Sequence, residues 1–305
     1  MAHGRGVEGL NNKILVRART MELVNKLERW GHAVAQFTAS LPAIPRSTIR
    51  EAYITAANKF LNASDTVRAC WGICALNGAV FIAWQVPRLA GFMVGNFAHY
   101  PLSGRARTLL TSVFSHHSLL HLLFNSMALL SFGAAVGVFL DRSPSDLLES
   151  TTKYHFLAMF ISAGLVSSLA SHMVKVRVYD RVVANLSKLP GSGAPPFIRG
   201  SLGASGAIYA CVTLTAMAYP DTQISLLFLP WGVPIRLGVG AMMTLDLVGI
   251  IRGWRMFDHI AHLGGALFGI WYYLYGPALW ARSRAIASYL FGTKPKEAKI
   301  VEEWT

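Results

Sequence analysis

Polar side chains that could do chemistry occur in three short motifs, each within an otherwise apolar stretch of this 305-residue chain. One of them reads Gly203-Ala-Ser205-Gly206-Ala-Ile-Tyr209. A serine between glycines at a helix start suits a nucleophile, because small neighbours let a substrate backbone approach and first-turn N–H groups can bind an oxyanion. Residue 207 is alanine, so this is not the Gly-x-Ser-x-Gly elbow of soluble hydrolases. Small residues at a helix contact would explain the motif equally well.

A second motif, Asp258-His259-Ile-Ala-His262-Leu-Gly-Gly265-Ala-Leu-Phe-Gly269, carries two histidines and a pair of spaced glycines. Gly265 and Gly269 form a small-xxx-small face that lets two helices approach closely. His262 lies one turn earlier on the same face. If the neighbouring helix is the one with the serine, the two side chains form the minimal pair for an activated hydroxyl nucleophile.

Asp258 permits two interpretations. It stands where the N-cap of the following helix is expected. It also precedes His262 by four residues, which would allow a Ser-His-Asp triad. We favour the cap over the catalytic acid, and we expect His259 at a helix interface.

The third motif, His116-His117-Ser-Leu-Leu-His121-Leu-Leu-Phe-Asn125, offers several hydrogen-bond donors. Residues four apart share a helix face, so we expect His121 and Asn125 to project together, with His117 one turn earlier. Hydrogen bonds between helices are the alternative interpretation. There is no His-Glu-x-x-His pattern and acidic residues are nearly absent from the apolar stretches, so we expect neither a metal site nor a cofactor.

The elements that position these motifs follow from where the charges lie. Charged residues make up 14% of the chain and hydrophobic ones 53%, with a net charge of +13. A helix needs about 20 apolar residues to cross a bilayer, and every backbone group in hydrocarbon must be paired internally. Five stretches of 19 to 33 residues without charge meet this length, and a sixth, shorter one around Leu237 to Ile251 carries Asp246. The five lie between Arg68 and Arg88, Arg107 and Asp141, Lys153 and Lys175, Arg199 and Asp221, and Asp258 and Arg282. We therefore predict an all-α membrane protein with six transmembrane helices.

Other protein classes fit less well. Core helices of soluble proteins rarely reach this length without a charge. The basic residues lie in loops and termini and form no stripe, which argues against nucleic-acid binding. Repeated halves, frequent in transporters, are missing. Three cysteines exclude a disulfide framework, so we interpret Cys70, Cys74 and Cys211 as packing residues.

The regions outside the apolar stretches divide the chain into three parts. Residues 1–66 form a basic extension without a spanning segment, in which Met21 to Phe37 has the spacing of an amphipathic helix. A transit peptide is the alternative there, although the glutamates of this region weaken it. Residues 67–281 form the helical domain and 282–305 a C-terminal tail. Within the domain we expect residues 175–200 to be the largest loop and residues 222–235, with two prolines, to be a loop or half-buried element.

Together the three motifs resemble those of the rhomboid intramembrane serine proteases, and within them the mitochondrial, presenilin-associated rhomboid-like type. The resemblance covers roughly residues 67–280. The subgroup assignment depends on Phe-Leu-Pro at 228–230 and on the long run at 257–272. The matching residues are His116, His121 and Asn125 in the second core helix, Gly203, Ser205, Gly206 and Tyr209 at the fourth, and His262, Gly265 and Gly269 in the sixth.

This resemblance implies an enzyme with a Ser205–His262 dyad and no required acid. Asn125, His121 and the Ser205 amide would stabilise the oxyanion, and Tyr209 would pack against His262. The implied substrates are single-pass membrane proteins cleaved in or near their spanning helix, and the fifth helix with residues 252–257 would form the substrate gate. The implied location is the mitochondrial inner membrane. The alternative is a catalytically inactive relative that binds and escorts membrane helices.

One feature departs from the mitochondrial type, which has a further spanning helix and a cleaved presequence ahead of the core. Residues 1–66 contain no stretch long and apolar enough to span. We expect that the chain is truncated, begins at a different start, or lacks this helix. The distribution of basic residues would place both termini inside, opposite to the mitochondrial arrangement of the core.

Overall fold

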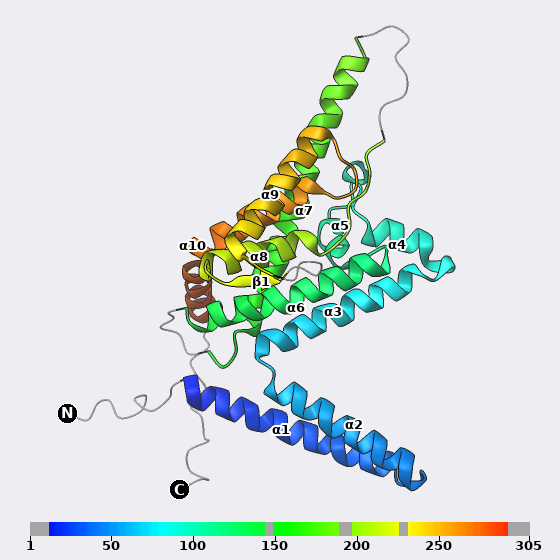
Figure 1. The fold of residues 1–305 in the computed structure, drawn as a ribbon. Helices are drawn as coiled ribbons and strands as arrows, with labels where there is room; N and C mark the ends of the chain where they lie inside the picture. Colours follow the sequence, from blue (N-terminus) through cyan, green and yellow to red (C-terminus); the bar gives the residue numbers. More distant parts are fainter. Residues whose placement is uncertain (1–11, 144–148, 189–196, 226–230, 292–305) are drawn as a thin grey trace, which may run out of the picture.

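The computed structural model describes residues 12–143, 149–188, 197–225 and 231–291. Figure 1 shows a bundle of helices with a separate helical hairpin at the N-terminal end. The described part is almost entirely helical, and its two short strands form one small hairpin. The prediction of an all-α protein is therefore confirmed for the described residues.

Each of the six predicted apolar stretches contains one main helix. Three of them, α3 (Asp65–Trp84), α6 (Leu119–Asp141) and α7 (Lys153–Leu186), are long and apolar enough to cross a membrane. The fourth, α8 (Ser205–Ala218), is apolar but shorter. It lies at the centre of the bundle, in contact with α6, α7, α9 (Ile235–Arg252) and α10 (His259–Phe291), and ten of its fourteen residues are buried. A short central helix of this kind places its first residue inside the bundle.

Two predicted helix ends are wrong. α7 continues past Lys175 to Leu186, so the first part of the predicted loop at 175–200 is helical, while its Gly- and Pro-rich part at 189–196 lies outside the described residues. α10 continues past Arg282 to Phe291, into the predicted tail. Charged residues mark the end of an apolar stretch, but lysine and arginine are good helix formers and do not end a helix.

The connection between α3 and α6 consists of short helices that the charge pattern did not predict. They are η1 (Pro87–Leu89), α4 (Ala90–Phe97), η2 (Pro101–Ser103), α5 (Thr108–Thr111) and η3 (Ser112–Phe114). Within this connection, His99 forms an antiparallel bridge with Ser201. The bridge ties the connection to the segment that leads into α8.

The predicted loop or half-buried element at residues 222–235 contains two strands. β1 (Gln223–Ser225) pairs antiparallel with β2 (Gly232–Pro234). Residues 226–230, which include the Phe-Leu-Pro motif, lie outside the described part. The hairpin precedes α9 directly.

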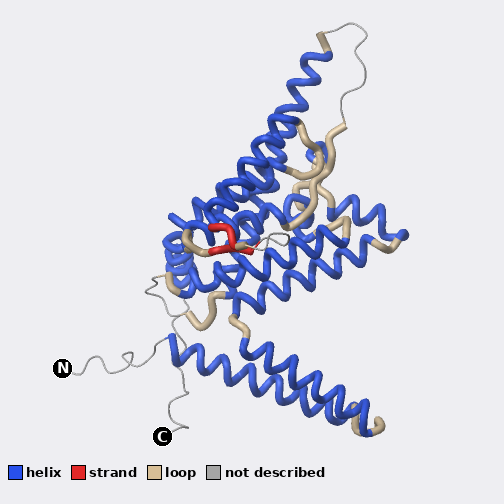
Figure 2. Tube along the Cα trace, viewed as in Figure 1, coloured by secondary structure: helices blue, strands red, loops and turns tan. Residues whose placement is uncertain are grey.

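The N-terminal extension forms a helical hairpin of α1 (Asn12–Phe37) and α2 (Ala43–Asn62), set apart from the bundle in Figure 2. The predicted helix at 21–37 lies within α1, whereas α2 was not predicted. Leu27 is the one buried residue among the two helices. The hairpin is linked to the bundle by an ion pair between Arg19 and Asp65, the first residue of α3.

The core of the bundle lies around α8. Cys70 and Cys211 are fully buried in it, and Cys74 packs against it. The cysteines are therefore packing residues, as predicted.

Candidate active site

The segment before α8 places Ser205 at the first position of the helix. Gly203 has a φ of +130°, a conformation that other residues rarely adopt, and its N–H donates to the carbonyl of Ser112 at 2.9 Å. Because α8 begins at Ser205, the N–H of this residue is one of the first-turn donors without an acceptor in the helix. Such a donor suits a developing negative charge.

α10 packs directly against α8, so the close neighbour that the glycine spacing predicted is the helix that carries Ser205. A methyl group on Gly265 would collide with the carbonyl of Gly206, and one on Gly269 would collide with the carbonyl of Ala210. Gly206 is itself packed against the side chain of Ser167 on α7. The close contact brings together the two helices that carry the serine and the histidine.

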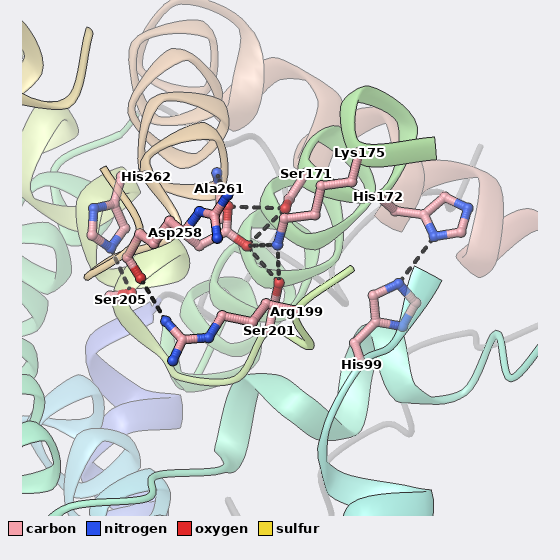
Figure 3. A network of polar contacts seen from close by, with 11 residues as sticks. His99, Ser171, His172, Lys175, Arg199, Ser201, Ser205, Asp258, Ala261 and His262 are labelled. Atoms are coloured by element: carbon pink, nitrogen blue, oxygen red, sulfur yellow. Dashed lines mark hydrogen bonds and ion pairs between the residues drawn. The ribbon is translucent and has the colours of Figure 1, made fainter. Parts of the chain in front are cut away.

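His262 and Ser205 are in hydrogen-bond contact. Nε2 of His262 lies 2.9 Å from Oγ of Ser205, and Figure 3 shows the pair side by side. The ring of Tyr209 stacks on His262 with centroids 4.5 Å apart and an interplanar angle of 13°. Tyr209, one turn after the serine on α8, therefore fixes the plane of the imidazole.

A third residue, Asp246 on α9, completes the hydrogen-bond chain. Its Oδ1 lies 3.1 Å from Nδ1 of His262 and 2.6 Å from Nδ1 of His259. A carboxylate only accepts, so we assign the proton of His262 to Nδ1. Nε2 is then free to accept the proton of the Ser205 hydroxyl. Sequence reasoning missed this role, although a carboxylate in an apolar stretch is itself a signal of function.

Asp246, His259 and His262 also have the side-chain types of a metal site. Their ligand atoms lie within 4.8 Å of one another. Both imidazoles direct Nδ1 at the same carboxylate oxygen, and the ring of His259 packs on Gly249. The hydrogen bonds account for both Nδ1 atoms, and they place His259 at the α9–α10 interface, as predicted.

Asp258 has different partners. Its Oδ1 accepts the backbone N–H of Ala261 at 3.2 Å, so it caps α10 as we favoured. Its Oδ2 lies 2.7 Å from Nζ of Lys175 and 2.5 Å from Oγ of Ser201, and Ser171 donates to both oxygens (Figure 3). These contacts join the start of α10 to α7 and to the segment before α8.

The electrostatics of Asp258 agree with a structural role. Burial opposes ionisation of this carboxyl group, but Lys175 and two serine hydroxyl groups outweigh burial and lower the pKa of Asp258 to about 2. The carboxylate of Asp258 is therefore bound by Lys175 and by hydrogen-bond donors, whereas the carboxylate in contact with His262 is that of Asp246.

The predicted oxyanion residues are only partly brought together. His121 lies against Gly203, where an added Cβ would stand 2.8 Å from Cε1 of the ring, and it lines the same cavity as Ser205 and His262. Asn125 is buried, and its amide donates to the carbonyl of His121 at 2.9 Å. In this conformation the Asn125 amide is used within its own helix.

The other two histidines of the motif differ: His116 packs against His121, and His117 lies apart from it. His116 is fully buried and contacts the ring of His121 edge-on, with centroids 4.8 Å apart. His117 packs on Trp84 instead of sharing a face with His121, because α6 starts only at Leu119, after the N-cap Ser118. The prediction that His117 joins this face is wrong.

Comparisons with known proteins agree on one family. The family model described as the rhomboid domain matches residues 103–278. The mouse (Mus musculus) protein named presenilin-associated rhomboid-like protein, mitochondrial, is 35% identical over 230 residues, which cover 74% of this chain and 54% of that protein. The human (Homo sapiens) protein of the same name is 35% identical over 225 residues, covering 73% and 52%. The yeast (Saccharomyces cerevisiae) rhomboid protein 1, mitochondrial, is 26% identical over 221 residues, covering 71% and 54%.

The chain thus spans about half the length of these relatives. Its apolar helices and the match to the rhomboid domain make it a membrane protein, and its relatives are mitochondrial. The chain belongs to the rhomboid family and is a mitochondrial membrane protein.

Proposed function

We propose that this protein is an intramembrane serine endopeptidase that cleaves single-pass membrane proteins in or near their spanning helix. The observation that carries the proposal is the 2.9 Å contact between Ser205 Oγ and His262 Nε2 inside an apolar bundle. The pair lines a cavity of about 1040 Å³ that has room for a substrate segment. The contact between Ser205 and His262 supports the protease over the alternative, an inactive protein that binds and escorts membrane helices.

In the proposed reaction, Ser205 Oγ attacks the scissile carbonyl carbon while its proton passes to Nε2 of His262. The resulting imidazolium is stabilised by Asp246 through Nδ1–H. His262 then protonates the leaving amine, and the peptide C–N bond breaks to give an acyl-enzyme. A water molecule then gives a proton to the same imidazole and attacks the ester carbonyl. His262 passes that proton to Ser205 Oγ as the ester C–O bond breaks and the acid product leaves.

The tetrahedral oxyanion would be bound by the Ser205 N–H and by His121. Asn125 would join them after its amide turns away from the carbonyl of His121. Loss of one such donor typically costs about 10²- to 10³-fold in rate. Of the three proposed donors, only Asn125 must first break a hydrogen bond before it can bind the oxyanion.

The proposed setting is the mitochondrial inner membrane, with one span in each of α3, α6, α7, α8, α9 and α10. A peptide bond in a regular helix is shielded, so the substrate must unwind locally at the cavity. Glycine or proline in the substrate helix would favour unwinding. α9 and residues 252–257 are the proposed gate, and the end of α9 and residues 253–257 line the cavity.

The test is cleavage of a tagged single-pass membrane protein, with glycine and proline in its spanning helix, in proteoliposomes. We expect the wild type to cut it and Ser205→Ala and His262→Ala to leave it intact. If wild type binds the substrate without cutting it, the inactive escort is the better description. If the variants cut as fast as wild type, the assignment of the pair is wrong.

A further inference from the structure

The cavity extends from the catalytic pair to a part of α7 that the proposed reaction does not use. Its inner wall holds His121, Ser205 and His262. Its outer wall holds Val174, Val178 and Val182, spaced four residues apart and therefore on one helix face. At about 1040 Å³ the cavity is as large as the larger ligand sites of proteins, about 300–1,000 Å³. It has room for several residues around a scissile bond.

The outer wall lies beyond the apolar layer. Four of the seven residues from Lys175 to Arg181 are charged, which keeps this part of α7 out of hydrocarbon. In Figure 1, α7 rises past the neighbouring ends of α9 and α10. The valines of the outer wall are therefore presented to water or to a bound segment.

Exposed apolar side chains gather at the mouth of the cavity. Val178 is 53% exposed, and Phe197 and Met256, on the two segments opposite α7, are each 82% exposed. An apolar patch of this kind on a hollowed surface marks a binding site. Its continuity with Ser205 indicates that the same chain occupies both ends of the cavity.

The charge at the mouth specifies the occupant further. The guanidinium of Arg199 donates to the backbone carbonyl of Arg255 at 3.1 Å, so two cationic residues lie next to each other on the lining. Neither forms an ion pair with a carboxylate in the part of the chain that the structure describes. The carboxylate of Asp258, on the same lining, is already engaged by Lys175.

We propose that the outer half of this cavity is a docking site for the substrate segment that leaves the membrane beside Ser205, with apolar side chains on the α7 valines and an acidic side chain at Arg199 and Arg255. The proposal rests on the proposed protease function and deepens it. A substrate would be held at two points, by its unwound helix at the catalytic pair and by its emerging segment at the outer wall. Binding at the second point lowers KM and leaves the chemistry at Ser205 untouched.

The test compares two substrates in liposomes of phosphatidylcholine, so that anionic lipid cannot occupy the site. Both are the same tagged single-pass protein, with either glutamate or lysine in the emerging segment. Each cleavage rate is divided by the rate at which a fluorophosphonate labels Ser205 in the same sample. Failure of the wild type to label or cleave would overturn the protease function itself, whereas the docking site is judged only from the variants.

We expect Arg199→Glu to raise KM for the glutamate substrate about fivefold, the upper end of the scale of one exposed ion pair. The matched control is Arg177→Glu, which makes the same charge change on an exposed residue outside the lining. The decisive outcome is exchange of preference, in which Arg199→Glu cleaves the lysine substrate better than the glutamate one.

For the valines, we expect Val178→Ser to raise KM about fivefold for both substrates, because it removes apolar contact. Met173→Ser is its control, since Met173 is 44% exposed on another face of α7 and lies outside the lining. If both Arg199→Glu and Val178→Ser give the KM of wild type, with cleavage and labelling intact, the docking site does not exist.

Discussion

Asp246 and Asp258 are two carboxylates that both contact the first turns of α10, but their partners differ. Asp246 is buried between helices, and its partners are two imidazoles. Asp258 is partly exposed at the start of α10, and its partners are a lysine, two serines and a backbone N–H. Asp258 lies nearer to His262 in the sequence, but Asp246 contacts it. Proximity along the chain therefore offered Asp258 as the alternative acid, whereas the carboxylate in contact with His262 is that of Asp246.

The difference lies in what each carboxylate binds. The Asp246 carboxylate contacts Nδ1 of both His259 and His262 and so determines where the proton of His262 resides. The Asp258 region holds segments of backbone together, since Ser201 lies four residues before Ser205 and Lys175 lies on α7. We therefore expect changes at Asp246 to lower catalysis and changes at Asp258 to lower stability.

Among the changes that test this comparison, the largest effect is expected from Asp246→Asn. An asparagine amide can donate to Nδ1 of His262 and would stabilise the tautomer with its proton on Nε2, which cannot accept from Ser205. We expect kcat to fall about 10²- to 10⁴-fold with little change in KM, as for the same change in other triads. Cleavage kinetics in proteoliposomes measure this, with Asp258→Asn as the matched control. Equal activity of the two variants would remove the distinction between the regions.

The second-largest effect is expected at the contact between α8 and α10, on which the positions of both carboxylates depend. In Gly265→Ala the new methyl group collides with the carbonyl of Gly206, so α8 and α10 must separate. Overpacking of this kind costs about 1–3 kcal/mol, and the apparent Tm in detergent should fall by several degrees. Gly72→Ala, where an added Cβ meets nothing within 4 Å, is the control. An unchanged Tm in Gly265→Ala would mean that the helices are not in this contact.

A smaller effect is expected at Asp258 itself. Asp258→Asn keeps a good N-cap but loses the charge that pairs with Lys175, whereas Asp258→Ala loses both. Loss of the cap costs about 1 kcal/mol, so we expect the Tm to fall in the order wild type, Asn, Ala. Labelling of Ser205 should stay within about tenfold of wild type. If Asp258→Asn stays folded but no longer labels, this residue is the catalytic acid after all.

The smallest effect is a pH dependence of the same contact. The pKa of Asp258 is lowered to about 2 from an ordinary value of 3.8, so ionisation stabilises the fold above pH 3.8. This stabilisation is lost as the pH falls through the folded-state pKa. The Tm difference between wild type and Asp258→Asn should be constant from pH 7 to about 5 and shrink between about pH 4 and 2. A difference that stays constant down to pH 2 would contradict the contacts of Asp258.

The sequence was sufficient for the parts of the site that depend on one helix at a time. Ser205 at a helix start, and His262 one turn before Gly265, are local patterns with a local cause. Two glycines in one stripe also predicted a close neighbour for α10, but the structure was needed to identify that neighbour as α8. Asp246 could not be placed in this way, since its contact depends on how α9 and α10 are rotated against each other.

The errors have related causes. Apolar length predicts where a helix meets the membrane but not where it ends, and so the extension of α7 beyond Lys175 was mistaken for a loop. That extension is also where the docking site is proposed. The Asn125 amide shows the same limit at the scale of one side chain, because its spacing from His121 predicts a shared face and does not predict that it donates to the carbonyl of His121.

The most direct measurement of the central claim is fluorophosphonate labelling of the purified protein, with the adduct located by mass spectrometry. Ser205 activated by His262 should carry the adduct in the wild type, and labelling should be lost in Ser205→Ala and nearly lost in His262→Ala. An adduct on another residue, or labelling of His262→Ala as fast as wild type, would contradict the account.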